Sequence, residues 1–301
     1  MAIYEAGSVT KAAARLLVAQ SALSQQLAHL EEELGVPLFV RSPHGVDATE
    51  FGRIFYEHSL EILRRIGEAT ASVRRLGRYP GGTVAVGMPE SISIVLGLPL
   101  LQNAKQRFPD TYLRLSEDLS VNLKARVKDG SLDLAILFDD GIEEGIAARP
   151  LVAEDLFFVS QQRPDRGSVV SVADALDSPL VLPDVRDGLR TIIENAALAA
   201  DVTLPHVVSE IGSLTVIKNA VLQGVGSTLL PMSCVASEVE QGLLSAQAVA
   251  DPGIRCTVVL CTRKDAQLTH AAASVFQSAV TTARELCIGE GWVGAIPLAD
   301  D

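Results

Sequence analysis

Small hydroxyl and amide side chains line one face of a helix predicted from about Gln20 to Leu34, near the start of this 301-residue chain. Groups of this kind form hydrogen bonds with base edges and phosphates in the major groove of DNA. This face is therefore a candidate for reading a DNA sequence. The candidate contacts are Gln20, Ser21, Ser24 and Gln25.

A second short helix is predicted just before this one, from Ser8 to about Leu17, with a break at Val18 and Ala19. Apolar residues recur at helical spacing in both segments, and Gly35 ends the second one. Two helices joined in this way are typical of a helix-turn-helix, whose second helix enters the major groove. An ordinary helical hairpin with a polar outer face would show the same pattern.

A short extended run, Pro37 to Arg41, follows the second helix and leads into a turn-rich stretch. A hairpin at this place is typical of a wing, and Arg41 on it is positioned to contact a DNA phosphate. The alternative for Arg41 is a solvated surface arginine. We also count Thr10 and Thr49 among the expected DNA contacts.

A helical pattern without proline continues from Glu50 to Leu76. Its less polar positions alternate spacings of four and three, which is the seam of a coiled coil and favours a dimer. One long amphipathic helix packed on its own body is the alternative. The seam positions are Phe55, Ser59, Ile62, Ile66, Ala69, Val73 and Leu76.

The net charge of −12 is unevenly distributed along the chain. Residues 1–80 carry nine basic and nine acidic side chains, whereas the remaining residues carry 16 and 28. A neutral head permits DNA binding, and an acidic body repels DNA. Charge alone does not indicate DNA, so the motifs of the head must support that prediction.

The order strand–helix–strand–helix–strand occurs twice in the body, from Thr83 to Phe138 and from about Leu180 to Leu230. This order predicts parallel sheets covered by helices, and hence two α/β lobes. The lobes are expected to join near Leu156–Ser160 and Ile254–Thr262. Ligands bind such sheets outside the carboxyl ends of their strands, which here meet in the cleft between the lobes.

Three serines, Ser91, Ser120 and Ser213, each open a predicted helix at such a strand end. Their hydroxyls and the following backbone N–H groups are suited to bind an anion. Arg190 is the expected counter-ion of a carboxylate, unless it forms only a surface salt bridge. A helix cap without any ligand is the common role of a single serine. The expected effector contacts are Ser91, Ile92, Ser120, Asp184, Arg190 and Ser213.

Enzymatic motifs do not occur where a nucleotide-binding sheet would need them. The stretch Thr83–Pro89 lacks G-x-G-x-x-G, and Pro89 removes a backbone donor. The chain has no P-loop, no H-E-x-x-H and no G-x-S-x-G. The alternatives to a regulator are a Rossmann-like enzyme and a two-lobed solute-binding protein, and the helical head argues against the latter.

The four cysteines contain no C-x-x-C pair, which indicates neither a zinc site nor a disulfide framework. No apolar run reaches the length of a membrane helix, and the first residues do not read as a secretory signal. We therefore expect a cytoplasmic protein without a metal or a bound cofactor.

Three stretches together resemble the signature of LysR-type transcriptional regulators. They are Ala12–Leu16, Gln20–Leu27 and Leu30–Arg41. The match is long and ungapped. The body contains further segments that resemble the family, such as Asp129–Ile136 and Gly224–Pro231. The sequence from Arg41 to Gly52 is similar to that of the nitrogen-assimilation-control branch of this family.

The resemblance implies a winged helix-turn-helix head (1–49), a linker and dimerisation helix (50–79) and an effector domain (83–301). The effector domain is expected to be two-lobed and periplasmic-binding-protein-like, with lobe I at about 83–157 and 258–288 and lobe II at about 158–257. The predicted fold class is α+β multidomain.

The resemblance also implies partners and a mechanism. A homotetramer and contact with RNA polymerase come from the resemblance alone. The other expected partners are double-stranded DNA, a second copy in a homodimer, and a small-molecule effector whose anionic character is inferred from the three serines and Arg190. We expect the effector to change the angle between the lobes and thereby the bending of DNA.

The start of the chain departs from the family pattern. Members of the family open with a further helix of about ten residues, roughly three turns, and Met1 falls inside it. We expect that the native chain begins upstream of Met1, and that a chain starting at Met1 binds DNA weakly.

Overall fold

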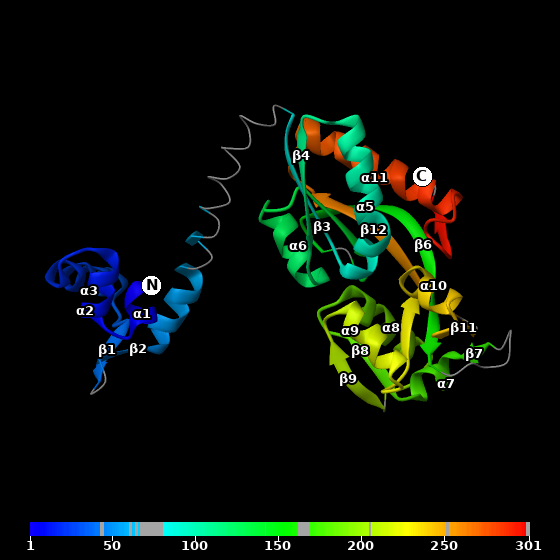
Figure 1. Ribbon diagram of the computed structural model, residues 1–301, viewed down its shortest axis with the longest axis horizontal. Coiled ribbons are helices and arrows are strands. Elements are labelled where there is room, and N and C mark those ends of the chain that lie inside the picture. Colours follow the sequence, from blue (N-terminus) through cyan, green and yellow to red (C-terminus); the bar gives the residue numbers. More distant parts are fainter. Residues whose placement is uncertain are drawn as a thin grey trace. The chain divides into compact units, whose positions relative to one another are not determined.

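The computed structural model describes residues 1–42, 45–59, 62–63, 66, 81–141, 143–161, 169–204, 206–250 and 253–298 (Figure 1). The chain divides into two compact units, unit 1 from Met1 to Gly77 and unit 2 from Arg78 to Asp301. Each unit has its own secondary structure and its own core, and each is described by itself.

Unit 1 contains the predicted pair of helices followed by a two-stranded hairpin. Residues 50–59 then form a further helix, and residues 62, 63 and 66 are also helical. The first four positions of the predicted seam are thus in helix, whereas Ala69, Val73 and Leu76 lie outside the described residues. The elements are α1 (Ala2–Ala6), α2 (Val9–Leu16), α3 (Gln20–Leu34), β1 (Phe39–Ser42) and β2 (Gly45–Ala48).

Local chemistry sets the ends of the two central helices. The Ser8 hydroxyl accepts a hydrogen bond from the Lys11 N–H at 3.4 Å and caps α2. Leu17 ends α2 in the left-handed region, at φ 57°, with 93% of its surface exposed. Gly35, at φ 71°, ends α3 in the same region, where a glycine costs least.

The core of unit 1 is small. Its buried apolar side chains among the described residues are Ile3, Ala12, Ala13 and Leu38. The leucines of α3 remain partly exposed, and α3 buries none of its residues. A hollow of about 220 Å³ lies along these leucines, lined also by residues of α1 and of the helix after β2. Unit 1 therefore has few interior contacts to stabilise it.

Unit 2 is built on one large twisted sheet, with strand order β4-β3-β5-β12-β6-β11-β7. β3, β4 and β5 are parallel to one another, as predicted, and β12 joins them antiparallel. The strands of this lobe, called lobe I, are β3 (Gly82–Met88), β4 (Thr111–Glu117), β5 (Leu134–Phe138), β12 (Arg255–Arg263) and the first part of β6 (Ile146–Ser160).

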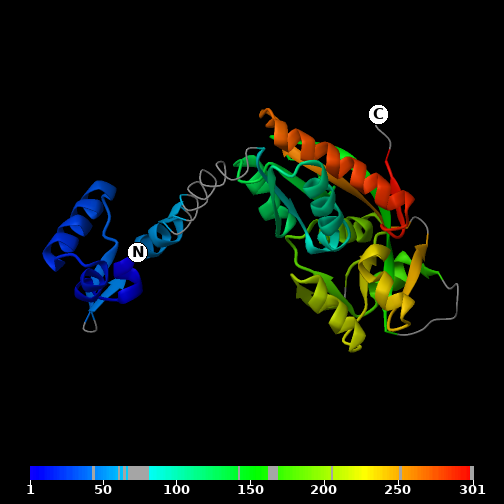
Figure 2. The same ribbon diagram turned by 45° about the horizontal axis from the view of Figure 1, so that its top comes forward.

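Helices cover both faces of the lobe I sheet, and the alternation of the strands assigns the side chains to two interiors. α5 (Glu90–Arg107) and α11 (His270–Ile288) pack side by side on one face, as Figure 2 shows. α6 (Ser120–Lys128) packs on the other. On β3, for example, Val86 points to the first interior and Ala85 to the second.

Lobe II surrounds the end of β6. β8 pairs with β9 and β7 pairs with β11 in parallel, whereas β10 and β11 pair antiparallel with β6. The prediction of a purely parallel second sheet is therefore wrong, because β6 enters lobe II as an additional strand. The elements are β7 (Val170–Ser171), α7 (Val172–Asp177), β8 (Leu180–Pro183), α8 (Gly188–Ala199), β9 (Val207–Ile211), α9 (Leu214–Leu222), β10 (Thr228–Pro231), α10 (Met232–Glu240) and β11 (Ser245–Ala250).

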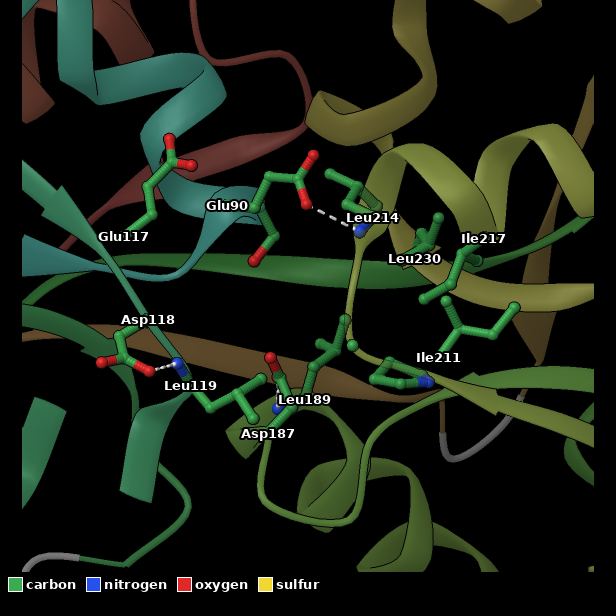
Figure 3. A pocket seen from close by; sticks show the side chains of 13 residues that line it. Glu90, Glu117, Asp118, Leu119, Asp187, Leu189, Ile211, Leu214, Ile217 and Leu230 are labelled. Carbon is green, nitrogen blue, oxygen red and sulfur yellow. Dashed lines mark hydrogen bonds between the residues drawn. The ribbon is translucent and has the colours of Figure 1, made fainter. Parts of the chain in front are cut away.

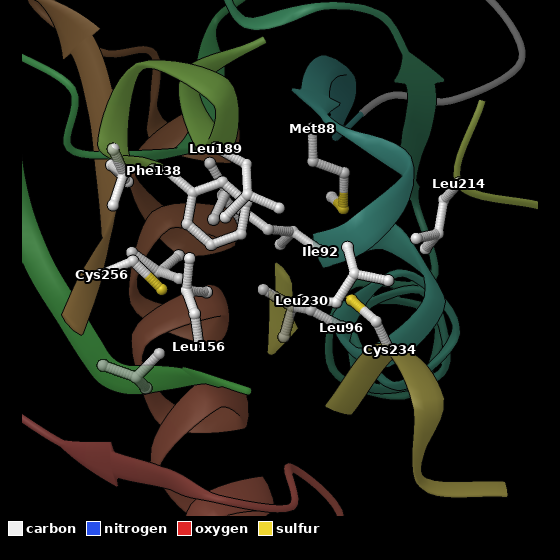
Figure 4. Close-up of a cluster of buried hydrophobic side chains, with 14 of the residues drawn as sticks. Met88, Ile92, Leu96, Phe138, Leu156, Leu189, Leu214, Leu230, Cys234 and Cys256 are labelled. Carbon is white, nitrogen blue, oxygen red and sulfur yellow. The ribbon is translucent and has the colours of Figure 1, made fainter. Parts of the chain in front are cut away.

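The two lobes share the long strand β6 and a continuous core. β6 pairs with β12 over Ile146–Asp155 in lobe I and continues into lobe II as far as Ser160. Figure 4 shows Phe138 and Met88 of lobe I in one buried cluster with Leu189 and Leu230 of lobe II. The passage of β6 between the lobes, from its pairing with β12 to its pairing with β10 at Leu156, lies at the predicted junction near Leu156–Ser160.

The chain after α11 packs back on β6. Strand β13 (Ala295–Pro297) pairs with β6 beside Glu154, and Trp292 is 1% exposed. The Trp292 Nε1–H and the Ser233 hydroxyl donate to Oε2 of the buried Glu154 carboxyl, at 3.1 and 3.0 Å. Burial raises the pKa of Glu154 to about 7, and these hydrogen bonds oppose the rise.

Candidate functional site

The polar face predicted on α3 is exposed in unit 1. Gln20, Ser21 and Gln25 are exposed, and Ser24 is half-buried. The Gln20 amide donates to the Ser24 hydroxyl at 2.8 Å, so these two side chains hold one another on the first turn of α3. The α3 amino end therefore presents two amides and two hydroxyls on one surface, as a major-groove contact needs.

The remaining predicted DNA contacts differ in position. Thr10 is exposed on α2. The backbone of Arg41 lies in β1, and its side chain is outside the described residues. The Thr49 hydroxyl lies 2.8 Å from the Pro37 carbonyl and accepts from the Gly52 N–H at 3.0 Å. Thr49 thus joins the segment before the hairpin to the helix after it, a structural role that sequence reasoning did not anticipate.

The position of the hairpin relative to α3 is set by a carboxylate. Glu31 Oε1 accepts from the backbone N–H groups of Leu38 and Phe39, at 2.6 and 3.1 Å. Hydrogen bonds from two successive N–H groups to one charged oxygen are strong and directional. The hairpin and α3 therefore form one rigid surface within unit 1.

A pocket of about 270 Å³ lies between the lobes of unit 2, at the carboxyl ends of β3, β4, β8 and β9 (Figure 3). This is the position that the sheet rule predicts. Its walls combine apolar side chains, among them Leu189, Ile211 and Ile217, with carboxyl groups. The carboxyl groups belong to Glu90, Glu117, Asp118 and Asp187, and none of the thirteen described lining residues is basic.

The three serines are close to this pocket, but none caps its helix as expected. Ser91 lines the pocket as the second residue of α5, where Pro89 is the cap position. Ser120 is the first residue of α6, and its buried hydroxyl accepts from the Gly188 N–H at 3.0 Å. Ser213 is in the cap position of α9 but forms no capping hydrogen bond of its own.

Arg190 does not line the pocket, although the sequence predicts it as the counter-ion of an anion. It is 6% exposed, and its guanidinium pairs with Glu194 at 2.7 Å and Glu210 at 3.1 Å. These ion pairs hold the guanidinium outside the pocket lining. Ile92 is a fully buried core residue, and Asp184 pairs with Arg186 at 2.8 Å.

None of the four acidic residues of the pocket is among the predicted effector contacts, and two of them, Asp187 and Glu90, have defined structural roles. Asp187 caps α8 by accepting from the Leu189 N–H at 2.9 Å. Burial, and the nearby charges of Asp140 and Asp184, raise its pKa to about 6. An aspartate directly before Gly188 is a capping signal that could have located it.

Glu90, the first residue of α5, crosses from lobe I to the amino end of α9 in lobe II. Its Oε2 accepts from the Leu214 N–H at 2.8 Å, as Figure 3 shows, and lies 3.5 Å from the Ser213 hydroxyl. Its Oε1 accepts from the hydroxyl and the N–H of Thr215, at 2.8 and 3.3 Å. The carboxylate therefore occupies the helix end that the sequence assigned to an external anion.

Comparison with known sequences identifies both units. Residues 1–53 match the family described as "Bacterial regulatory helix-turn-helix protein, lysR family", and residues 77–284 match the "LysR substrate binding domain". The chain is 34% identical over 236 residues to the nitrogen assimilation regulatory protein nac of Klebsiella aerogenes, covering 78% of this chain and 77% of that protein.

A second relative is the HTH-type transcriptional regulator BbuR of Bordetella bronchiseptica, 32% identical over 260 residues, or 86% of this chain and 80% of that one. The fold is similar to full-length CbnR complexed with its target DNA, at a TM-score of 0.70 and 21% identity, covering 94% and 96% of the two chains. It is also similar to a Corynebacterium glutamicum OxyR C206 mutant, at 0.57 and 24%, covering 95% and 92%.

Proposed function

We propose that this chain, which belongs to the LysR family of bacterial transcriptional regulators, reads its operator with α3 and responds to a small molecule in the pocket of unit 2. It is a regulator with a helix-turn-helix DNA-binding domain and an effector-binding domain. The observation that carries the proposal is the exposed amide and hydroxyl face of α3 inside the matched helix-turn-helix.

The proposed base contacts come from the first two turns of α3. Thr10 and Arg41 are proposed to contact the sugar–phosphate backbone of the DNA. Phosphate contacts position the domain, and the amides supply sequence preference. The proposed domains are residues 1–49 for DNA, 50–79 for the linker and 83–301 for the effector. A neutral unit 1 keeps the salt-dependent part of binding modest.

A pair of neighbouring glutamines provides a matched test on the same helix. Gln25 lies on the exposed face, whereas Gln26 lines the apolar hollow of unit 1. We expect Gln25→Ala to weaken binding to the DNA upstream of the gene by roughly tenfold or more, since one good base contact is worth about 1–3 kcal/mol. Gln26→Ala should change it less than about twofold.

The measurement is a mobility shift at fixed salt concentration with the full chain. Absence of binding by the wild-type chain at low salt contradicts the proposal. Equal losses in both variants would place the DNA contact elsewhere on unit 1.

We further propose a homodimer or homotetramer. An exposed apolar stripe on α5 supports it, because Ile94, Leu98 and Leu101 are 54%, 62% and 41% exposed and recur at helical spacing. Sedimentation should show a smaller species for Leu98→Glu than for Leu198→Glu, a control on α8 that is 80% exposed. An unchanged assembly would exclude this face.

The proposed response is a change in the angle between the lobes on effector binding, transmitted to DNA bending and to contact with RNA polymerase. The shared strand β6 and the pocket between the lobes support it. A small-angle scattering profile that stays the same with saturating effector would count against it. We propose a cytoplasmic location. No described helix has the length and apolar character needed to cross a membrane.

A further inference from the structure

The amino end of α9 carries a carboxylate from the opposite lobe. The first N–H groups of a helix have no partner within the helix, and the helix dipole favours a negative charge there. In α9 these groups belong to Leu214 and Thr215, and Glu90 accepts from both. The Thr215 hydroxyl completes the cradle at 2.8 Å. An external carboxylate at this helix end would need the same donors.

The Glu90 contact also connects the lobes. Glu90 follows Pro89 at the end of β3 in lobe I, and all of its hydrogen-bond donors belong to lobe II. A further connection beside the pocket runs from the Gly188 N–H to the Ser120 hydroxyl, at 3.0 Å. The chain itself thus supplies contacts between the lobes at the edge of the pocket.

The rest of the lining is unfavourable for an anion. Glu117 is exposed, Asp187 faces the pocket, and Asp118 has a partial counter-charge in Arg126 at 3.7 Å. Arg190, the cation expected here, is directed to Glu194 and Glu210. A carboxylate ligand would meet like charges at short range, whereas an ammonium group would meet several acceptors.

We propose that Glu90 is the specificity-determining group of this pocket: it fills the amino end of α9, holds the two lobes together, and restricts the effector to a molecule with a positively charged group on a short apolar body. The apolar walls formed by Leu189, Ile211 and Ile217 would contact that body. This inference rests on the proposed effector role of the pocket, and it replaces the anionic effector that the sequence suggested.

The test compares two small probes of opposite charge on the full chain. Putrescine and succinate share a four-carbon backbone and differ in the charge of their ends. In the wild-type chain we expect putrescine to raise the melting temperature and succinate to leave it unchanged, because only a ligand that prefers the folded state stabilises it. Glu90→Gln should weaken putrescine binding by on the order of tenfold.

The decisive arm is the response to succinate. Glu90→Gln removes the charge but retains an oxygen acceptor, and we expect the variant to gain stabilisation by succinate that the wild-type chain lacks. Glu144→Gln, the same charge change at an exposed position outside the pocket lining, should respond to both probes as the wild-type chain does. Circular dichroism establishes that each variant is folded.

Three outcomes would overturn the proposal. They are stabilisation of the wild-type chain by succinate as strong as that by putrescine, no response to putrescine, and no gain of a succinate response in Glu90→Gln. Binding to promoter DNA is measured in parallel on the same samples. Loss of DNA binding with the expected probe responses contradicts the regulator function and leaves the pocket assignment standing.

Discussion

Unit 1 and unit 2 have the same kind of amphipathic helices but bury them to different depths. In the described part of unit 1 the core consists of Ile3, Ala12, Ala13 and Leu38, and α3 buries no residue. Unit 2 has a continuous core that crosses both lobes and includes Phe138 and other large side chains (Figure 4). Unit 1 should therefore lose its fold through one small change, whereas unit 2 should tolerate larger ones.

The largest expected effect is the loss of unit 1 alone. Ala13→Asp places a carboxylate without a partner at a side chain that is 2% exposed, which costs several kcal/mol. Hydrogen exchange should then become fast in peptides of residues 1–59 and stay slow in those of unit 2. Ala14→Asp, on the exposed side of the same helix, is the control. Slow exchange in Ala13→Asp would show that unit 1 has a deeper core than its burial indicates.

A cavity in unit 2 should weaken that unit without unfolding it. Phe138 is 1% exposed at the junction of the lobes, and Phe138→Ala should lower the free energy of unfolding by about 3–5 kcal/mol. Leu198→Ala, at an 80% exposed position outside the proposed dimer face, should change it by less than about 0.5 kcal/mol. Urea unfolding measures both. Equal effects would mean that the core shown in Figure 4 does not limit stability.

The buried Glu154 should make the stability of unit 2 depend on pH. Its pKa is about 7 in the folded state and near 4.5 when unfolded, so the folded state retains a proton that the unfolded state loses. Stability therefore falls as pH rises from about 4.5 through 7, by on the order of 3 kcal/mol in total.

Glu154→Gln should reduce this dependence to the part that the raised pKa of Asp187 contributes, and should be more stable than the wild-type chain at pH 8. Urea unfolding from pH 5 to pH 8.5 checks it. Asp155→Asn, at the neighbouring exposed position that pairs with Arg255, is the control and should retain the slope. A wild-type stability that is constant across this range contradicts the assignment.

The smallest effect expected concerns the cap that joins two parts of unit 1. Thr49→Ala removes the hydroxyl that accepts from the Gly52 N–H and should cost about 1 kcal/mol. Thr10→Ala, exposed on α2, should be neutral or slightly stabilising, because alanine has the higher helix propensity. Thermal unfolding compares the two. If Thr49→Ala lost DNA affinity at unchanged stability, Thr49 would be a DNA contact.

Periodicity and end signals in the sequence predicted most of the elements. β3, α5 and β4 begin and end within one residue of the expected positions. Elements with little periodicity of their own were missed, such as β11 and β13, because pairing with distant strands, chiefly β6, defines them. The first part of β6 was missed for the same reason.

The sequence also located the pocket, but it predicted Arg190 as the charged residue there, whereas the described lining carries carboxyl groups. The strand-end rule depends on topology alone and holds for any sheet of this kind. The direction of a long side chain depends on tertiary partners, so Arg190 could not be distinguished from a residue that pairs with Glu194 and Glu210. The sequence around Glu90 could not show that its side chain reaches α9, because Ser213 and Leu214 lie 123 and 124 positions further along the chain.

Trp292 is the single tryptophan of the chain, and its indole lies buried against Glu154 in unit 2. The tryptophan fluorescence of the protein therefore reports on unit 2 only. An indole shielded from water and hydrogen-bonded to a titrating carboxyl group should change its emission between pH 5 and pH 8 without unfolding. Unit 1 contributes only tyrosine emission, from Tyr4 and Tyr56, whose rings stack at 4.1 Å. Selective excitation of tryptophan therefore reports on the effector domain, and the DNA-binding domain does not contribute to that emission.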